Sequence, residues 1–292
     1  MFSGSIPALV TPFRNGAVDE AAFRDFVSWQ VAEGSHGLVP CGTTGEVPTL
    51  SANDQHRLVE ICIDEAAGRV PVIAGCGSNN TATALEHMIH AQVAGAAAAL
   101  VVMPYYNRPS QDGLYAHFAA LADGCDLPII LYNVPGRTVA DMGTATMARV
   151  AALPSVVGVK DATGNLARVT EQRLACGADF CQLSGNDDMT LGFMAMGGTG
   201  CISVTANVAP RLCADFQNAC LAGDWTTALG LQDRLYPLHA ALFSDASPGP
   251  AKYALNRLRP HMPAELRLPL TPASEASRRA LDAALAHAGL AA

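Results

Sequence analysis

The sequence predicts an α/β protein, a (β/α)8 TIM barrel with a C-terminal helical appendage. Short β-branched or aliphatic runs alternate eight times with longer segments of helical period, which is the pattern of repeated βα units around a parallel sheet. The chain has 292 residues and 50% of them are hydrophobic, which is enough to fill one barrel of about 250 residues. After residue 206 only helical periods recur. We therefore expect a barrel over residues 1–206 and a helical region over residues 207–292 packed on it.

The strands are expected where aliphatic runs end in turn residues or polar residues. They span residues 5–10, 37–40, 70–74, 98–103, 128–131, 156–160, 180–183 and 201–204. Eight repeats in a chain of this length favour a closed barrel over an open doubly wound sheet.

Helices are expected between the strands, where apolar residues recur three or four positions apart. Phe23 and Phe26 share one face of a helix over residues 19–33. Ser51 and Asp54 resemble a capping box with the shorter acid, and they begin a helix that runs to residue 67. The other helices are expected to end near residue 95, to start at residue 110 or 112, and to span residues 143–153, 166–176, 189–196, 210–222, 224–241, 250–258 and 274–288.

Composition excludes several classes of function. The net charge is −8 and only 15% of the residues are charged, so neither nucleic acid nor an anionic membrane is an expected partner. The start of the chain lacks the features of a signal peptide, and no apolar run is suited to span a bilayer, which indicates a cytoplasmic protein. The nine cysteines are an odd number without a C-x-x-C pair, and none of the eight histidines falls at a strand end. Reduced thiols are therefore expected, and no metal site.

Lys160 stands out at the end of the sixth predicted strand. Only two of the 18 basic residues are lysines, Lys160 and Lys252, so the positive surface is built almost entirely from arginine. Burial favours a neutral amine, which is a nucleophile that forms Schiff bases with carbonyl compounds. A strand-end lysine that pairs with a nearby acid fits the position equally well.

Other unusual polar residues also follow predicted strands. They are Thr43 and Thr44 after the second strand, Tyr105 and Tyr106 after the fourth, Tyr132, Asn133 and Arg137 around the fifth, and Gly185 after the seventh. In a barrel the active site lies at the carboxyl ends of the strands. Each residue alone fits a role in loop packing, but their shared end of the barrel indicates catalysis.

These residue types suit imine chemistry on an α-keto acid. An imine on Lys160 makes the neighbouring methyl group acidic, because the iminium nitrogen accepts the electrons that deprotonation leaves behind. The hydroxyls of Tyr132 and Thr43 can transfer protons. The backbone N–H groups of Thr43 and Thr44 suit a substrate carboxylate, and Arg137 is a fork-shaped donor for a second carboxylate.

Five segments match the motifs of one known family. They span residues 42–46 (GTTGE), 104–109 (PYYNRP), 132–138 (YNVPGRT), 158–164 (GVKDATG) and 202–207 (ISVTAN). At these segments the chain resembles the 4-hydroxy-tetrahydrodipicolinate synthase (dihydrodipicolinate synthase) family, which are pyruvate-dependent lyases of the class I aldolase type. The resemblance extends over nearly the whole chain.

The resemblance implies condensation of pyruvate with L-aspartate 4-semialdehyde in diaminopimelate and lysine biosynthesis, without a metal or an organic cofactor. Lys160 would form the Schiff base with pyruvate, and the proton relay would consist of Thr43, Tyr132 and Tyr106. The substrates would contact Thr44, Arg137, Gly185 and Ile202, with Arg137 on the carboxylate of the semialdehyde. In the family the tyrosine that matches Tyr106 reaches the site of an adjacent subunit, which implies a tight dimer, usually doubled into a homotetramer.

Two other functions stay open, and one regulatory property is expected to be weak. N-acetylneuraminate lyases and keto-deoxy-sugar acid aldolases share the lysine and the tyrosine, but they generally lack an arginine at the place of Arg137. A silent barrel that binds keto acids as a regulator would usually have lost one of the reactive residues. Many bacterial members of the family are inhibited by lysine through an acid and a histidine, whose places align with Thr83 and Gln55, so we expect weak or absent inhibition.

Overall fold

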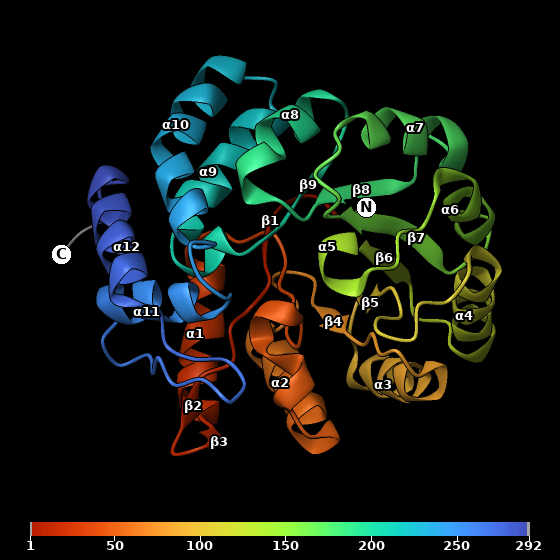
Figure 1. The fold of residues 1–292 in the computed structure, drawn as a ribbon, viewed down its shortest axis with the longest axis horizontal. Coiled ribbons are helices and arrows are strands. Elements are labelled where there is room, and N and C mark those ends of the chain that lie inside the picture. Colours follow the sequence, from red (N-terminus) through yellow and green to blue (C-terminus); the bar gives the residue numbers. More distant parts are fainter. Residues whose placement is uncertain (1, 291–292) are drawn as a thin grey trace.

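The computed structural model describes residues 2–290, and its main strands form one curled sheet of seven parallel strands. Their order in the sheet is β1 (Gly4–Pro7), β9 (Gly200–Ser203), β8 (Cys181–Ser184), β7 (Val156–Asp161), β6 (Ile129–Asn133), β5 (Ala98–Val102) and β4 (Ile73–Gly75). In Figure 1 the strands lie in the middle of the molecule and the helices surround them. This arrangement confirms the predicted α/β barrel architecture.

The ring closes between β1 and β4 through the segment at residues 37–40. Two isolated parallel bridges join this segment to its neighbours, Ala8 to Val39 and Leu38 to Val72. The prediction of a regular strand there is wrong in extent. The prolines at positions 7, 40 and 71 have no N–H group with which to lengthen the ladder.

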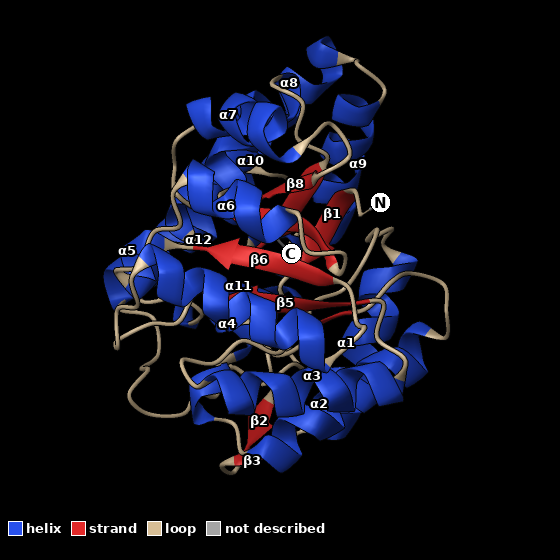
Figure 2. Cartoon of the chain, turned by 90° about the vertical axis from the view of Figure 1, so that its right-hand side faces the viewer, coloured by secondary structure: helices blue, strands red, loops and turns tan. Residues whose placement is uncertain are grey.

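Helices cover the outer face of the sheet on all sides that Figures 1 and 2 show. Around the barrel they are α1 (Glu20–Ala32), α2 (Ala52–Ala66), α3 (Thr81–Ala94), α4 (Gln111–Gly124), α6 (Thr144–Ala151), α7 (Ala167–Cys176) and α8 (Thr190–Ala195). The predicted capping box is confirmed, because the Ser51 side chain accepts from the Asp54 N–H and the Asp54 carboxylate accepts from the Ser51 N–H. Helix α3 starts earlier than its apolar pattern, because the side chain of Asn80 caps it.

The last part of the described chain contains helices without strands, as predicted. These helices are α9 (Pro210–Leu221), α10 (Trp225–Ala241), α11 (Gly249–Leu258) and α12 (Glu275–His287). They gather on one side of the barrel, cyan to blue in Figure 1, and α9 packs against β1.

A small hairpin between β1 and α1 was not predicted. It pairs β2 (Phe13–Arg14) with β3 (Ala17–Val18) in antiparallel register. Asn15 and Gly16 form its turn with φ values of 54° and 79°. An Asn-Gly pair is a strong hairpin signal, because both positions of the tight turn need a positive φ.

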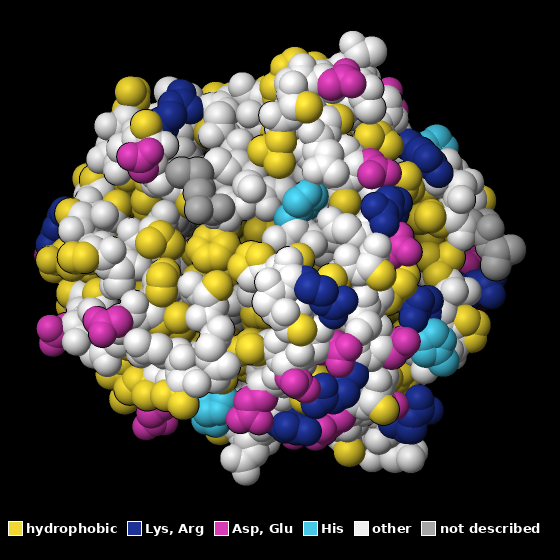
Figure 3. Space-filling view, turned by 180° about the vertical axis from the view of Figure 1, so that it is seen from behind, with side chains coloured by type: hydrophobic (Ala, Val, Ile, Leu, Met, Phe, Trp, Pro, Cys, Tyr) yellow, Lys and Arg dark blue, Asp and Glu magenta, His cyan; other side chains and the backbone are white. Residues whose placement is uncertain are grey.

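The surface shows no continuous basic face on the side drawn in Figure 3. Dark blue Lys and Arg side chains there lie among magenta Asp and Glu side chains. Within residues 2–290, no helix combines the length and the apolar character that crossing a membrane requires.

The interior of the barrel is filled by its own cluster of inward side chains. It includes Ile6, Leu100, Ile130, Leu183 and Ile202, all buried, together with Tyr132. Register continues this layer, because Tyr132 of β6 pairs with Lys160 of β7, which in turn pairs with Leu183 of β8. Paired residues of parallel strands point to the same face of a sheet. Lys160 therefore projects into the barrel.

Candidate active site

Lys160 lies near the carboxyl end of β7 with only 6% of its surface exposed. Its Nζ atom lies 4.2 Å from the centre of the Tyr132 ring. Tyr132 is itself 7% exposed and belongs to the interior cluster. The structure thus brings together, on two paired strands, the amine and the phenol that the sequence predicts to react.

The alternative role for Lys160, a strand-end lysine paired with an acid, does not fit the structure. Among the described residues, no carboxylate oxygen lies within 4.0 Å of the Lys160 Nζ. The adjacent acid, Asp161, points away from Lys160 because successive side chains of a strand alternate in direction. The Lys160 amine is therefore not engaged in an ion pair with residues 2–290, as a nucleophile requires.

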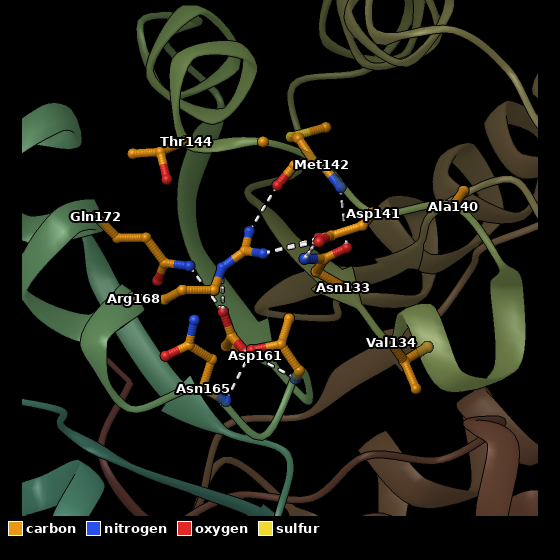
Figure 4. A network of polar contacts seen from close by, with 12 residues as sticks. Asn133, Val134, Ala140, Asp141, Met142, Thr144, Asp161, Asn165, Arg168 and Gln172 are labelled. Carbon is orange, nitrogen blue, oxygen red and sulfur yellow. Dashed lines mark hydrogen bonds and ion pairs between the residues drawn. The ribbon is translucent and has the colours of Figure 1, made fainter.

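Asp161 is engaged on the other face of the strand, in a polar network drawn in Figure 4. Its carboxylate accepts hydrogen bonds from the Gln172 amide at 2.7 Å and from the Thr163 N–H at 2.9 Å. The Arg168 Nε atom lies 3.4 Å from the same carboxylate. These contacts fix the end of β7, and with it the backbone that carries Lys160.

Arg168 also links β7 to the end of β6. Its guanidinium donates to Asp141 at 2.8 Å and to the carbonyl of Met142 at 2.6 Å (Figure 4). The Asn133 amide, next to Tyr132, donates to Asp141 at 2.7 Å. Sequence reasoning missed Asp141 and Arg168, because nothing local in either segment indicates that they meet.

Thr43 and Thr44 lie in the short 3₁₀ helix η1 (Thr43–Gly45) that follows the segment at residues 37–40. Neither the Thr43 nor the Thr44 N–H donates a hydrogen bond to any group among residues 2–290. The first N–H groups of a helical turn have no partner inside the turn. Two adjacent free N–H groups on one turn form a concave donor site for an anionic oxygen. This geometry fits the predicted binding of a carboxylate.

A cavity of about 220 Å³ opens beside this turn. Thr43 and Arg137 both line it, from η1 and from the short helix α5 (Pro135–Thr138). The rest of its lining consists of Val47, Pro48, Gly77, Val102, Tyr105, Val134 and Thr138. The cavity therefore joins the Thr43 turn and the arginine fork that the sequence predicts for two different carboxylates.

Gly185 directly follows β8, and Ile202 lies on β9. Ile202 is buried in the interior cluster. The Gly185 N–H donates to the Asp161 carbonyl at 2.7 Å, so only its carbonyl is left to face a ligand. A Cβ at position 185 would lie 2.7 Å from the Cβ of Ala162, and this close approach requires glycine.

Tyr106 is not brought to the cavity within this chain. It lies on the loop between β5 and α4 with 90% of its surface exposed and a φ of 70°. Its neighbour Tyr105 lines the cavity instead. The Tyr106 hydroxyl can therefore act in an active site only where that site belongs to a different copy of the chain.

Within residues 2–290, no group of three or more His, Cys, Asp or Glu side chains is arranged to hold a metal ion. Burial raises the pKa of the Cys41 thiol well above its ordinary value, which disfavours the thiolate that a nucleophile needs.

Nearly the whole chain matches the model of one known protein family. The model of the Dihydrodipicolinate synthetase family matches residues 1–288. The chain belongs to this family. Membership in the Dihydrodipicolinate synthetase family agrees with the resemblance at the five sequence segments and with the barrel and its C-terminal helices.

Individual relatives are similar over their whole length. The 4-hydroxy-tetrahydrodipicolinate synthase of Rhizorhabdus wittichii is 69% identical over 100% of both chains. The 4-hydroxy-tetrahydrodipicolinate synthase of Sphingopyxis alaskensis is 65% identical over 99% of this chain and 100% of its own. The crystal structure of the chloride-inhibited dihydrodipicolinate synthase of Acinetobacter baumannii, complexed with pyruvate, superimposes with a TM-score of 0.96 at 40% identity, over 99% of this chain and 100% of its own.

Proposed function

We propose that this chain condenses pyruvate with L-aspartate 4-semialdehyde, as a 4-hydroxy-tetrahydrodipicolinate synthase of diaminopimelate and lysine biosynthesis. The observation that carries the proposal is the Lys160 amine, enclosed in the barrel beside Tyr132 and free of any carboxylate partner among residues 2–290. Relatives that share 65% and 69% of the sequence bear this name. The relative from Acinetobacter baumannii forms a complex with pyruvate.

The first half of the reaction makes the Schiff base. The Nζ of Lys160 attacks the keto carbon of pyruvate, and a proton moves from the nitrogen to the carbonyl oxygen to give a carbinolamine. A second proton converts the hydroxyl to water, which leaves, and the iminium forms. We assign these proton transfers to the hydroxyls of Tyr132, the register partner of Lys160 on β6, and of Thr43, which follows the segment at residues 37–40 at the same end of the barrel.

The second half forms the carbon–carbon bond and releases the lysine. Removal of a methyl proton from the iminium gives an enamine, whose carbon attacks the aldehyde of the second substrate. The amine of that substrate then attacks the imine carbon, which closes the ring and frees Lys160. The steps exchange only protons and one water molecule, so we propose that the chain uses neither a metal nor an organic cofactor.

We assign the carboxylates of the two substrates to two separate anion-binding sites. We assign the pyruvate carboxylate to the free N–H groups of Thr43 and Thr44, with Gly185 and Ile202 beside it. We assign the carboxylate of the semialdehyde to Arg137, whose guanidinium binds a carboxylate in a bidentate manner. The cavity of about 220 Å³ lies between these two assigned sites, since Thr43 and Arg137 both line it.

The exposed Tyr106 supports a proposal about assembly. We infer that Tyr106 completes the proton relay in the site of a second copy, within a tight dimer that doubles into a homotetramer. One structural relative is a monomeric dihydrodipicolinate synthase variant, so the assembly is a property to measure for each member. We also propose that the enzyme is cytoplasmic, with residues 1–206 bearing the site and residues 207–292 supporting it.

Borohydride trapping tests the central step. The protein is reduced with borohydride in the presence of pyruvate, and the modified peptide is identified by mass, in parallel with a coupled assay on aspartate semialdehyde. We expect the adduct on Lys160 and turnover of the semialdehyde, and neither with Lys160→Arg, which keeps the charge but is not a nucleophile. An adduct on Lys252, or none, would contradict the proposal. An adduct on Lys160 without turnover of the semialdehyde would instead favour a sugar-acid lyase.

A further inference from the structure

The second lysine of the chain, Lys252, is as unusual in its surroundings as Lys160. It lies on α11 with 1% of its surface exposed, and its Nζ atom contacts three groups from distant parts of the chain. It forms an ion pair with the carboxylate of Glu46, donates a hydrogen bond to the Glu265 carbonyl at 2.7 Å, and lies 4.3 Å from the centre of the Phe13 ring. The proposed reaction has no use for this amine.

Burial makes the Lys252 charge depend on its partner. Loss of contact with water lowers the pKa of Lys252 to about 8, and the Glu46 carboxylate opposes that shift. A fully buried ammonium is retained only where a carboxylate and further hydrogen bonds compensate it. The C-terminal helix α11 is thereby joined to Glu46, which lies 206 positions earlier in the chain.

Glu46 is the residue that ends the Thr43 turn. Its backbone is in the left-handed region, with a φ of 59°, and its N–H donates to the Thr43 carbonyl at 3.1 Å. Its side chain is fully buried, and Lys252 is the only cationic side chain within 4.0 Å of it among residues 2–290. One carboxylate oxygen also accepts the Arg267 N–H at 3.1 Å. Two residues of the C-terminal region, Lys252 and Arg267, therefore hold Glu46 in this strained conformation.

The other side of the turn is held by the barrel itself. The Thr11 hydroxyl donates to the Gly45 carbonyl at 2.7 Å, and the Gly45 N–H donates to the Gly42 carbonyl at 3.0 Å. The turn is thus held at Gly45 by Thr11 of the barrel and at Glu46 by Lys252. The Thr43 and Thr44 N–H groups belong to this turn, so their direction depends on how it is held at these two points.

We propose that Lys252 is a positioning residue for substrate binding: through Glu46 it holds the Thr43–Thr44 turn so that its free N–H groups face the pyruvate carboxylate. Lys252 itself touches no substrate. The inference rests on the proposed function, because it assigns the turn to the carboxylate of the keto acid. It gives the C-terminal helical region a part in catalysis as well as in packing.

The test compares Lys252→Met, which keeps the length of the side chain and removes its charge, with the parent protein at pH 7. Borohydride trapping counts the sites that form an adduct with pyruvate, and kcat is calculated per competent site. The KM for pyruvate is measured from the dependence of the rate on pyruvate concentration. We expect the KM for pyruvate to rise about tenfold or more, while the adduct stays on Lys160 and the KM for aspartate semialdehyde changes less than threefold. Lys252→Arg, which keeps the charge, should recover part of the loss.

A purely structural role would give a different result. Partial unfolding lowers the number of competent sites, and with it the maximal rate, but leaves the KM for pyruvate unchanged. That outcome would overturn the proposal. Arg57→Met, which breaks an exposed ion pair with Glu20 on the outer helices, is the matched control and should leave the KM for pyruvate unchanged.

A second variant covers the case in which Lys252→Met does not fold. Glu46→Gln keeps the shape of the side chain and removes its charge, and we expect the KM for pyruvate to rise in the same direction. In the Glu46→Gln, Lys252→Met double variant the effects should be less than additive, because both changes break one contact. Additive effects would show that the two residues act separately and would overturn the inference. Absence of any adduct in the parent would instead refute the proposed function itself.

Discussion

The Nζ atom of Lys160 lies over the Tyr132 ring, 4.2 Å from its centre, and the two residues are direct register partners on β7 and β6. A shift of one residue in this pairing would turn one of the two side chains out of the barrel. The register of the sheet therefore sets the distance between the amine and the phenol. The polar network around Asp161 and Arg168 fixes this register on the outer side of the same strands.

Tyr132→Phe should separate the two roles of this ring. The phenyl ring keeps the contact with Lys160, while the hydroxyl that we assign to proton transfer is lost. We expect kcat to fall by about 10² to 10⁴, with a nearly unchanged thermal unfolding temperature. Tyr115→Phe is the control, since Tyr115 also lies under a cation, Arg149 at 4.4 Å, but on the outer helices. A kcat close to that of the parent would show that another group transfers the protons.

Arg137→Ala should affect the second substrate. Charge-assisted hydrogen bonds contribute about 1.5 to 3 kcal/mol, so we expect the KM for aspartate semialdehyde to rise roughly 10- to 100-fold. Formation of the pyruvate adduct on Lys160 should be unaffected. Arg257→Ala, which removes an exposed arginine of α11, serves as the control. Loss of the pyruvate adduct in Arg137→Ala would mean that its carboxylate is wrongly assigned.

Arg168→Met should destabilise the protein strongly. The side chain of Asp161 is 4% exposed, and without Arg168 no cationic side chain of residues 2–290 lies within 4.0 Å of its buried charge. Breaking a buried pair in this way costs about 3 to 5 kcal/mol of unfolding free energy. Arg149→Met, which breaks an exposed pair with Asp112, should cost less than about 1 kcal/mol. Urea unfolding of both variants measures the difference, and equal losses would contradict the role of the network.

His117 should make the fold sensitive to acid. It is 5% exposed, and burial lowers its pKa from 6.5 to about 4. Between these two values the unfolded chain binds a proton that the folded chain does not, so stability falls as the pH falls through 6.5. For this one group the loss from pH 7.5 to pH 5 is about 2 kcal/mol.

His117→Gln removes the titrating group, so its unfolding free energy should fall less over that pH range, although it is less stable at neutral pH. Urea unfolding at both pH values gives the comparison. Equal pH dependence in parent and variant would assign the acid sensitivity to other groups.

Lysine is expected to inhibit the enzyme weakly or not at all. The position that aligns with the family's histidine holds Gln55, which is buried and donates to the Gly75 carbonyl at 2.8 Å. The position that aligns with the acid holds Thr83, so the ligand's ammonium has no carboxylate there. A lysine titration of the purified enzyme tests this, and tight inhibition would refute it. Thr83→Glu should bind lysine more tightly than the parent, by about tenfold or more, because it supplies a charged acceptor.

Local signals predicted most of the fold. The β-branched runs and helical periods specified the alternating elements, and Ser51 with Asp54 specified a helix start that the structure reproduces. The Asn15–Gly16 pair, where the small hairpin turns, is a local signal of the same kind. At residues 37–40 the apolar run predicts a regular strand, but the structure has only two isolated bridges there. An apolar run does not show that neighbouring prolines lack the N–H groups that a longer ladder of hydrogen bonds needs.

Contacts between distant segments could not be predicted from the sequence. Lys160 could be singled out because lysine is rare in this chain and because it ends an apolar run. Asp141 and Arg168 carry no such mark, and their ion pair forms only when α7 packs beside the loop after β6. The pairing of Glu46 with Lys252 likewise depends on α11 reaching back to the barrel. A single sequence shows where a residue lies in an element, but it does not show which distant charge it meets.

The burial of both lysines has a consequence for an enzyme that handles an aldehyde. Lys160 and Lys252 are 6% and 1% exposed, so the protein presents no lysine side-chain amine to solvent. Guanidinium groups, which supply the rest of its positive charge, stay protonated and form no imines at neutral pH. A reactive aldehyde that strikes the outside of the molecule therefore finds no lysine to modify. Its lysine side chains are therefore shielded from the aldehyde in solution, except for the Lys160 amine that must react.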